Sequence, residues 1–383
     1  MRITQKDIAK NLGISLITVS RAFNDSGYVS AELKKRIMDY AKRQSYVPHR
    51  GSQILVRNKT RRIAVFTSTF PSFVWDDIEK GVLSAAAYIR PLNYEVHFFR
   101  IPDFDTECYL KTLKREIRNG LDAAAFLCMR MYRMKEIVVL AEKSGIPYVF
   151  YNVDDPETNR LCYIGTDYPA GGRLAANFIG KSLGLMETGR VLVIGINEDV
   201  DHMTDGPDIN AKRIRGFLEV LGSQYPFVES RVEYINMKVK TGVGVQIKRL
   251  LKDNEGRVDA VYFVPAFTGS FLDGLEAYDY RRTITLLHDV KDQALRCLEN
   301  GLLTAIVFQD PVLQGYTAVR TLENILESKI RERQRDIEIA HTLIFRENIN
   351  YLKNHYLLSE PEDEAPSKSR AAPPIQSTGT GSG

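Results

Sequence analysis

The chain has 383 residues, of which 44 % are hydrophobic and 26 % charged, a globular composition long enough for more than one domain. No stretch approaches about 18 consecutive apolar residues and no secretory signal precedes the first polar helix, so we expect a cytoplasmic protein without a membrane span. The cysteines are far apart and form no paired metal-ligand spacing, which predicts reduced core thiols; they are Cys108, Cys128, Cys162 and Cys297.

Two short helices are predicted at the N-terminus. Thr4 can cap a first helix from about Gln5 to Asn11, and Gly13 can adopt the positive φ that ends it. Ser15 can then cap a second helix, whose inward face would consist of Val19, Ala22 and Phe23. This spacing predicts a helix-turn-helix, although an ordinary helical hairpin would have the same pattern.

The outward face of the second helix has an unusual composition. It would present Leu16, Ile17, Ser20 and Arg21, and two exposed aliphatic side chains beside an arginine suit base edges and thymine methyl groups better than water. A third helix is expected from Ala31 to about Gln44, capped by Ser30. The three helices would share one small core, and their outward face would bind DNA.

Positive charge is concentrated at the same end of the chain. Residues 1–62 carry 14 Lys and Arg against 4 Asp and Glu, a net +10, which leaves −6 for the rest because the whole chain carries +4. Such a distribution favours contact with phosphates, and the affinity for DNA should then fall steeply with salt. The alternative is a basic surface that is merely solvated.

The N-terminal pattern resembles the lactose/galactose-repressor family of bacterial transcription regulators. The matching motifs are Ser15-x-x-Thr18-Val19-Ser20-Arg21-x-x-Asn24, Val29-Ser30 and Tyr46-x-Pro48. The resemblance implies that Leu16 and Ile17 read the bases. It also implies that other positions contact the DNA backbone or brace the headpiece, namely Thr4, Ser15, Thr18, Ser20, Arg21 and Asn24. We therefore assign residues 1–48 to an all-α DNA-binding headpiece.

Residues 49–62 are polar and basic and form the predicted linker. In the family this segment forms a hinge helix on DNA that places a leucine in the minor groove, and Leu55 matches that leucine. Gly51 and Ser52 depart from the apolar and alanine residues usual there, and a glycine costs about 1 kcal/mol relative to alanine in a helix. A flexible linker is therefore the alternative to a DNA-induced hinge helix.

Short apolar runs alternate with amphipathic segments after the linker, which predicts parallel α/β sheets. The expected strands are Ile63–Thr67, Glu95–Arg100, Ala123–Leu127, Tyr148–Asn152, Arg190–Gly195, Val232–Ile235, Val258–Val264, Thr283–His288 and Ala305–Gln309. A helix from about Val312 to Glu327 and one strand around Glu338–Phe345 should follow. Residues 63–355 are thus expected to form a large α/β domain, and residues 356–383 a disordered tail.

The large domain should consist of two lobes. The first set of strands ends near Tyr151, and the segment Tyr163–Arg173 is expected to open the second lobe through a turn and a new helix. Gly165-x-Asp167 with Ala170-Gly171-Gly172 resembles the crossover in the family's effector domain. The resemblance implies a two-lobed fold of the type I periplasmic-binding-protein kind, which would bind a small molecule between its lobes.

Candidate ligand contacts in the first lobe follow from this resemblance. Phe73 and Trp75 occupy the family's aromatic ligand-contact segment, and a sugar's C–H face could pack on the Trp75 ring. Trp75 could equally be a core residue. Asn152 stands where the family usually has an aspartate, and Val153 replaces its arginine partner, so this pair has lost both charges but keeps an amide that donates and accepts.

Candidate contacts in the second lobe are Arg213, Asp289 and Gln309. Arg213 precedes Gly216-Phe217 and matches the family's ligand-binding arginine, whose rigid fork suits a carboxylate or neighbouring hydroxyls; a surface salt bridge is the alternative. Asp289 and Gln309 follow predicted strands and match the sugar-binding pattern, and we prefer this role to helix capping.

Three classes of function compete. The pattern favours a dimeric regulator, most simply a repressor, that binds palindromic double-stranded operator DNA and senses a sugar-like small molecule, with no metal or cofactor. The second class is a cytoplasmic carbohydrate-binding module without specific DNA readout. The third is an enzyme on an α/β scaffold, but the sequence has no phosphate-cradling loop, metal-ligand pair or nucleophile elbow.

Overall fold

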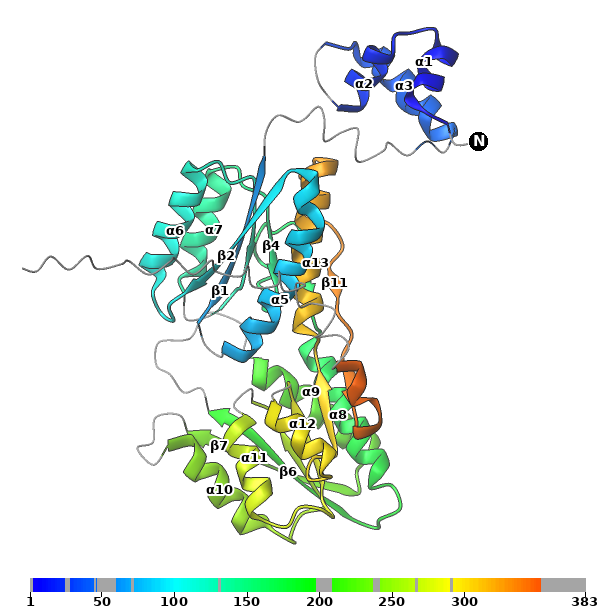
Figure 1. Cartoon of the computed structure of the whole chain (residues 1–383). Helices are drawn as coiled ribbons and strands as arrows, with labels where there is room; N and C mark the ends of the chain where they lie inside the picture. The colour runs from blue at the N-terminus through cyan, green and yellow to red at the C-terminus, as the bar shows by residue number, and fades with distance from the viewer. Residues whose placement is uncertain are drawn as a thin grey trace, which may run out of the picture.

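The N-terminal helices form a small bundle. The structure is a computed structural model that describes residues 3–24, 28–44, 46, 60–69, 72–129, 132–197, 209–236, 242–265, 268–289 and 292–352. The bundle consists of α1 (Gln5–Leu12), α2 (Leu16–Asn24) and α3 (Ala31–Arg43), as Figure 1 shows. Its core is made of Ile8, Ala9, Val19, Ala22, Ile37 and Ala41. The three predicted helices are confirmed.

Local hydrogen bonds explain where these helices begin and end. Thr4 Oγ1 accepts from the Asp7 N–H, and the Asp7 carboxylate accepts from the Thr4 N–H at 2.9 Å, which is a capping box. Gly13 has φ +66°, a conformation in which a side chain would be strained. Ser15 Oγ accepts from the Thr18 N–H at 3.0 Å and caps α2.

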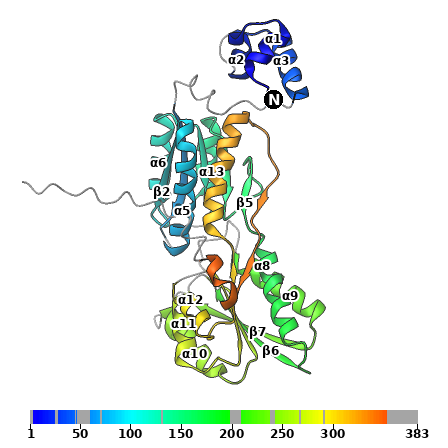
Figure 2. The ribbon, with the colours of Figure 1, turned by 45° about the vertical axis from the view of Figure 1, so that its right-hand side comes forward.

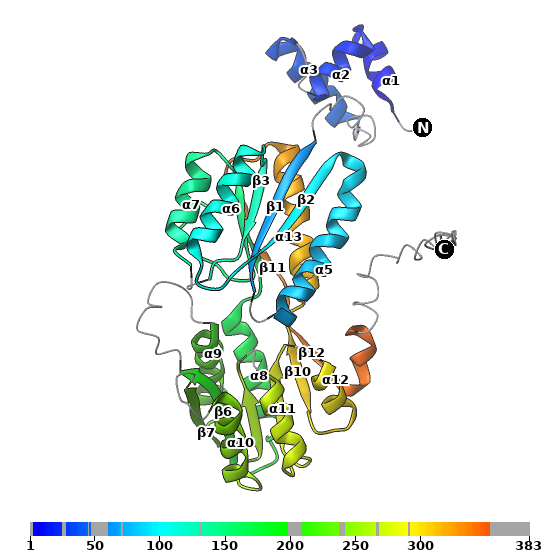
Figure 3. The same ribbon diagram turned by 60° about the vertical axis from the view of Figure 1, so that its left-hand side comes forward.

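The first lobe is a parallel sheet with helices on both faces. Its strands are β1 (Arg61–Ser68), β2 (Tyr94–Ile101), β3 (Ala123–Phe126), β4 (Tyr148–Tyr151), β5 (Tyr163–Gly165) and β11 (Ile337–Glu338), in the order β11-β5-β4-β3-β1-β2. One face carries α5 (Ser72–Ile89) and α13 (Pro311–Ser328), and the other carries α6 (Thr106–Arg118) and α7 (Met134–Lys143), as Figure 3 shows. The short helix η1 (Arg90–Leu92) links α5 to β2.

The second lobe repeats this architecture. Its strands are β6 (Gly189–Asn197), β7 (Val228–Asn236), β8 (Ala260–Phe263), β9 (Ile284–His288), β10 (Ala305–Phe308) and β12 (Thr342–Ile344), in the order β12-β10-β9-β8-β6-β7. One face carries α8 (Tyr168–Ser182) and α9 (Ile209–Gln224), and the other α10 (Gly242–Asn254), α11 (Thr268–Ala277) and α12 (Asp292–Glu299) (Figure 2). The helix η2 (Arg346–Asn348) follows β12. The two-lobed α/β prediction is confirmed.

Two details of the predicted strands were wrong. The segment around Tyr163 was assigned to the opening of the second lobe, but β5 pairs with β4 and belongs to the first sheet. The single strand expected at Glu338–Phe345 is two short strands, because the chain leaves the first sheet after β11 and joins β10 in the second sheet as antiparallel β12. In addition, β1 begins at Arg61, so its first two residues lie in the stretch assigned to the linker.

Three described segments connect the lobes. They join β5 to α8, β10 to α13, and β11 to β12. The Ile339 N–H, in the last segment, donates to the Gly165 carbonyl in the first at 2.8 Å. Arg160, which is only 1 % exposed, pairs with Asp154 in the loop between β4 and β5 and with Asp336 beside β11, at 2.7 Å to the latter. The crossing segments are therefore held to one another as well as to their sheets.

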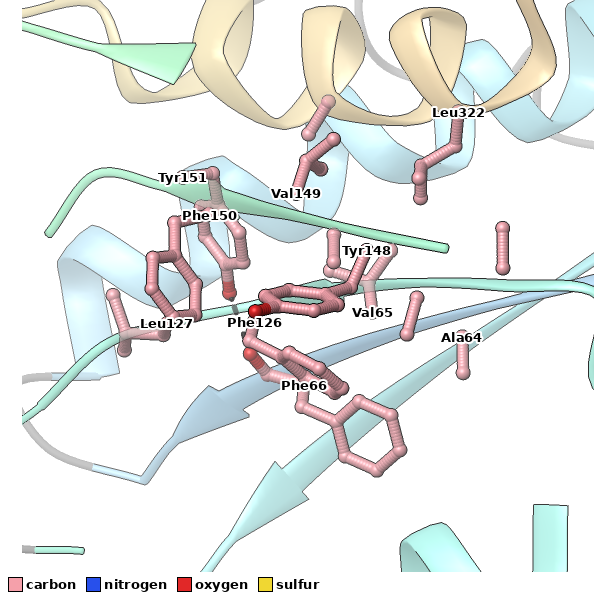
Figure 4. Packing of buried hydrophobic residues seen from close by; sticks show 14 of the residues in the cluster. Ala64, Val65, Phe66, Phe126, Leu127, Tyr148, Val149, Phe150, Tyr151 and Leu322 are labelled. Carbon is pink, nitrogen blue, oxygen red and sulfur yellow. Dashed lines mark hydrogen bonds between the residues drawn. The ribbon is translucent and has the colours of Figure 1, made fainter. Parts of the chain in front are cut away.

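Aromatic side chains fill the core of the first lobe. Figure 4 shows Phe66, Phe126, Tyr148 and Tyr151 packed between the strands, and the Tyr151 hydroxyl donates to the Phe66 carbonyl oxygen at 2.9 Å. Burial of such rings provides most of the free energy that favours folding. Among the cysteines, Cys128, Cys162 and Cys297 are buried and Cys108 is half-buried, and all are free thiols. Among the helices that the structure describes, none is long and apolar enough to cross a membrane.

Glycines allow two pairs of helices to approach closely. A Cβ at Gly315 of α13 would lie 2.2 Å from the Ile78 carbonyl oxygen of α5, and a Cβ at Gly81 of α5 would lie 1.9 Å from the Val312 carbonyl oxygen. In the second lobe, a Cβ at Gly172 of α8 would lie 1.9 Å from a carbonyl oxygen of α9. Each lobe thus has one helix pair whose spacing a single methyl group would change.

We predict that Gly315→Ala destabilises the protein by about 1–3 kcal/mol, because the added methyl meets backbone that cannot rotate away. Gly222→Ala, at an exposed position in α9 with no atom within 4 Å of the new Cβ, is the matched control and should be neutral or stabilising by up to about 1 kcal/mol. Urea unfolding measures both. Equal effects of the two substitutions would contradict the close packing of α5 and α13.

Candidate functional site

The outward face of α2 carries the predicted DNA-reading residues. Leu16 is 47 % exposed and Ile17 63 % exposed, and Arg21 is also exposed, whereas Val19 and Ala22 face the core. Leu16 and Ile17 are adjacent aliphatic residues that already contact water, so contact with another surface would remove no packing from the headpiece core. The structure therefore brings Leu16, Ile17 and Arg21 to one exposed surface.

Other headpiece positions make local contacts or lie outside the described residues. Thr4 Oγ1 donates to the Asp7 carboxylate at 2.7 Å, and the hydroxyls of Ser15 and Thr18 are 2.7 Å apart, so these three side chains brace the ends of helices. Ser20 is half-buried on α2. Asn24 ends α2, but its side chain is outside the described residues, as is the whole of Leu55.

The second candidate site lies at the boundary between the lobes. Asn152 directly follows β4, Asp289 follows β9 and Gln309 follows β10, so all three stand at the carboxyl ends of strands. In doubly wound sheets this edge is where ligands bind. Arg213 reaches the same region from α9. The exposed fraction is between 3 % and 5 % for all four residues, so the structure brings together four of the predicted ligand contacts in a buried place.

The backbone at these strand ends is unusual. Asn152 has φ +58° and Asp289 has φ +68°, and Asp310, which caps α13, has φ +51°. Residues other than glycine adopt this region at a cost of about 1–3 kcal/mol, and such residues cluster at active sites and ligand-binding positions. The Asp289 and Gln309 side chains bond to each other.

A chain of hydrogen bonds runs from one lobe to the other. The Tyr168 hydroxyl of α8 donates to the Asn152 carbonyl oxygen at 2.6 Å. Asn152 Nδ2 donates to Gln314 Oε1 at 2.9 Å, and Gln314 Nε2 donates to the Gln309 carbonyl oxygen at 2.8 Å. Four elements from both lobes, α8, β4, α13 and β10, are linked in this way, and only β10 and α13 are adjacent in sequence.

Charged groups close the chain into a ring. Gln309 Nε2 donates to Asp289 Oδ1 at 2.5 Å, Asp289 Oδ2 lies 3.9 Å from Arg213 Nη2, and the Arg213 guanidinium lies over the Tyr168 ring at 5.4 Å from its centroid. We call this set the interlobe ring; its members are Tyr168, Asn152, Gln314, Gln309, Asp289 and Arg213. The surface salt bridge considered for Arg213 is wrong, because its side chain is 3 % exposed.

The ring retains capacity for further hydrogen bonds. Arg213 has five N–H donors. Among the residues that the structure describes it makes one hydrogen bond, from Nη1 to the Val264 carbonyl oxygen at 3.2 Å, and its Nε has no partner there. Gln309 Oε1 is a buried acceptor that also has no partner among the residues described by the structure. Buried polar atoms are normally paired, so a donor and an acceptor in one place favour a polar ligand that can both accept and donate.

Close packing of two helices fixes the position of Arg213. The Arg213 carbonyl oxygen is the atom that a Cβ at Gly172 would meet at 1.9 Å, so α9 approaches α8 directly at the site. This approach also sets the distance between Arg213 and Tyr168, which lies one turn earlier on α8. In the sequence, Gly172 was singled out only as part of the motif that resembles the family's crossover.

Two histidines lie behind Arg213. His288 Nε2 is 2.6 Å from the Tyr262 hydroxyl, and the ring of His341, from the segment between β11 and β12, is 6.2 Å from the His288 ring. Burial, and secondarily Arg213, lowers the pKa of His288 well below its usual value and lowers the pKa of His341 to about 4. Burial raises the pKa of Asp289, against the opposing effects of Arg213 and Gln309. Both histidines are therefore neutral at pH 7.

The predicted aromatic contacts are not part of the ring. Trp75 is 3 % exposed and packs in the core of the first lobe, which was the alternative considered for it, and its Nε1 has no partner among the described residues. Phe73 lies in the first turn of α5, but its side chain is outside the described residues. A ligand role for either residue stays a prediction.

Sequence reasoning missed Tyr168, Gln314 and His341. Gln314 lies in the helix predicted from about Val312, five residues after Gln309, and Tyr168 directly follows Asp167 of the crossover motif, so both lay inside stretches that the sequence analysis named. No sequence signal marks His341, because its neighbours His288 and Gly171 come from distant elements.

We predict that His341→Gln makes stability less sensitive to acid. The folded protein holds His341 neutral down to about pH 4, whereas the unfolded chain takes up a proton below about pH 6.5. Between these two pH values, His341 therefore lowers the free energy of unfolding by up to about 1.4 kcal/mol for each pH unit of acidification. Above about pH 6.5 it has no such effect. Urea unfolding at pH 7, 6 and 5 measures the slope. His97→Gln, in half-exposed β2, is the control, and an identical slope for His341→Gln and the parent would contradict the burial of a neutral His341.

Two family models match the chain. Residues 4–49 match the model described as bacterial regulatory proteins, lacI family, and residues 63–330 match the periplasmic binding protein domain. The chain is 31 % identical to catabolite control protein B of Bacillus subtilis over 122 residues, which cover 30 % of this chain and 37 % of that protein. The alignments to the first curated relatives thus span about a third of their length.

Longer alignments agree with these matches. The regulator CelR of Thermobifida fusca is 26 % identical over 290 residues, which cover 72 % of this chain and 76 % of CelR. The crystal structure of a solute-binding protein of an ABC transporter from Burkholderia graminis, in complex with D-arabinose, has a TM-score of 0.63 at 21 % identity and covers 76 % of this chain and 98 % of that one. An N-terminal helix-turn-helix of lacI type followed by a two-lobed periplasmic-binding-protein domain identifies the chain as a member of the lactose/galactose-repressor (LacI) family of bacterial regulatory proteins.

Proposed function

We propose that this protein is a ligand-responsive transcription regulator that binds a palindromic operator as a homodimer and senses a sugar or sugar derivative between its lobes. The observation that carries the proposal is the combination of an exposed Leu16, Ile17 and Arg21 surface on a basic headpiece with a buried polar ring at the lobe boundary. A DNA-binding headpiece does not need a buried polar ring, and a ligand-binding domain does not need a headpiece, so their presence in one chain supports a regulator that uses both.

The headpiece chemistry suits double-stranded DNA. Leu16 and Ile17 would contact base edges and thymine methyl groups in the major groove, while Arg21 would bind a phosphate or a base edge. Thr4, Ser15 and Thr18 would hold the helices in the orientation that this contact needs. A dimer would place two headpieces on half-sites about 34 Å apart, which is one turn of the DNA.

The interlobe ring suits a hydroxyl-rich ligand. A sugar hydroxyl both donates and accepts, so it can pair with the Asp289 carboxylate, with Gln309 Oε1 and with the unused donors of Arg213. Support comes from the structural neighbour in complex with D-arabinose, which has the same two-lobed fold. Asn152 in place of an acidic residue would change which hydroxyl pattern, or which charged derivative, the first lobe accepts.

Ligand and DNA would be coupled through the first lobe. A ligand that contacts Asn152 in one lobe and Arg213, Asp289 and Gln309 in the other favours the closed arrangement of the two. The first lobe begins at β1, which the chain enters directly after the linker, so lobe rotation would change the spacing of the headpieces in a dimer. Couplings of this kind are typically about 1–3 kcal/mol, which changes DNA occupancy about 5- to 150-fold.

Selection of bound fragments from random duplex DNA, followed by footprinting at low salt, tests the proposal. We expect a protected site with two-fold symmetry. A thermal-shift screen of sugars, sugar acids and purines would identify the effector, which should then change the affinity for the selected site. Thermal stabilisation by a sugar without a symmetric footprint would instead support a carbohydrate-binding module without specific DNA readout.

Substitutions in the two sites should have separable effects. Arg21→Ala should weaken binding to the selected DNA about tenfold and reduce the slope of log affinity against log salt by about one, with no change in thermal stabilisation by the effector. Asp289→Asn should lower effector affinity at least about tenfold, since it removes a charged acceptor, and leave ligand-free DNA binding unchanged. Arg249→Ala and Asp253→Ala, an exposed pair on α10, are the controls. The reverse pattern would contradict the assignment of the two sites.

A further inference from the structure

One member of the interlobe ring, Gln314, joins the lobes through both polar atoms of its side-chain amide. Gln314 lies in the first turn of α13 and is 0 % exposed. Its Oε1 accepts from Asn152 Nδ2 at the end of β4 in the first sheet, and its Nε2 donates to the Gln309 carbonyl oxygen at the end of β10 in the second sheet. A single planar amide therefore sets the distance between two proposed effector contacts.

Both partners depend on this amide. Gln314 Oε1 is the acceptor for Asn152 Nδ2, and Gln314 Nε2 is the side-chain donor to the Gln309 carbonyl. Because Asn152 and Gln309 are 3 % and 4 % exposed, loss of Gln314 would leave a buried donor and a buried acceptor without a partner. An apolar side chain of similar volume would fill the space and pair with neither.

The rest of α13 cannot move to compensate. The neighbouring Gly315 lies against the Ile78 carbonyl of α5, and Gly81 of α5 lies against the Val312 carbonyl of α13, so the first turn of α13 is fixed to the first lobe. Gln314 is thus a rigid extension of the first lobe that reaches the backbone of the second. Figure 1 shows α13 beside α5, with β10 leading into it from the second lobe.

We propose that Gln314 is a positioning residue that holds the two lobes in the arrangement of this structure by joining Asn152 to Gln309, without itself contacting the effector. This inference rests on the proposed function only in that Asn152 and Gln309 are effector contacts. The arrangement of the lobes in the free protein then depends on one amide, and an effector that engages Asn152 and Gln309 acts on a boundary that Gln314 has already assembled.

Hydrogen exchange of the full-length chain, without ligand or DNA, tests the inference. The reporters are the Asn152 N–H, which donates to the Ile164 carbonyl oxygen, and the Ile339 N–H, which donates to the Gly165 carbonyl oxygen. The first belongs to the residue that Gln314 bonds, and the second lies in the segment that joins β11 to β12. Gln314→Leu should lower protection at both amides about tenfold. The matched control is Asn254→Leu, which removes a buried amide that accepts from Arg231 and donates to the Leu250 carbonyl oxygen within the second lobe only.

A second variant distinguishes positioning from general destabilisation. In Gln314→Glu a protonated carboxyl can still donate to the Gln309 carbonyl and accept from Asn152, whereas an ionised carboxylate places an acceptor against that carbonyl. Burial raises the pKa of such a carboxyl. At pH 5, protection of the two reporter amides in Gln314→Glu should therefore be near that of the parent, and at pH 8 it should be about tenfold lower. The parent, measured at both pH values, accounts for the other ionisable groups nearby, namely Arg213, Asp289, Asp310, His288 and His341.

The outcomes are decisive either way. A pH-dependent loss of protection at Asn152 and Ile339 in Gln314→Glu, absent in the parent and in Asn254→Leu, supports the inference. Parent-like protection in Gln314→Leu, or equal protection of Gln314→Glu at pH 5 and pH 8, overturns it. Because no DNA or effector is used, this result is independent of the footprinting experiment, and a failure of one is distinguishable from a failure of the other.

Discussion

The pairing of buried polar groups at the lobe boundary is the constraint on which the structure depends. Two parallel sheets direct the carboxyl ends of their strands to this boundary, where backbone and side-chain polar atoms are removed from water. The interlobe ring pairs several of them by joining residues from β4, α8, α9, β9, β10 and α13. Within the part of the chain that the structure describes, the ring leaves a donor on Arg213 and an acceptor on Gln309 without a partner, so the boundary retains hydrogen-bonding capacity.

Glycines at helix crossings fix the positions of the side chains that form the ring. Gly172 allows α9 to approach α8 and places Arg213 over Tyr168, and Gly315 with Gly81 fixes α13 to α5 and places Gln314 between Asn152 and Gln309. The two lobes therefore use the same device on equivalent helix pairs. Because packed helices cannot deform continuously, we expect a change in the ring to move a whole lobe.

The headpiece differs from the large domain in that its candidate binding residues are exposed. Its small core holds three short helices that depend on side-chain caps from Thr4, Ser15 and Ser30, and its outward residues remain exposed. Exposed Leu16 and Ile17 contribute little to the stability of the headpiece itself, which agrees with the contact with DNA that we propose for them. The large domain buries the residues proposed to bind the effector, whereas the headpiece exposes those proposed to bind DNA.

The sequence by itself determined everything that depends on neighbouring residues. Helical spacing and capping residues predicted all three headpiece helices, and apolar runs located β1 to β4 and β6 to β10, because a short stretch contains both the periodicity and the signals that end it. Family motifs also named Asn152, Arg213, Asp289 and Gln309, but not the contacts among them. Only the tertiary structure decided that Asn152 pairs with Gln314, 162 positions away, that β5 completes the first sheet, and that Trp75 is buried. These outcomes depend on where the chain crosses between lobes and on which buried donor meets which acceptor, and no local pattern encodes that choice.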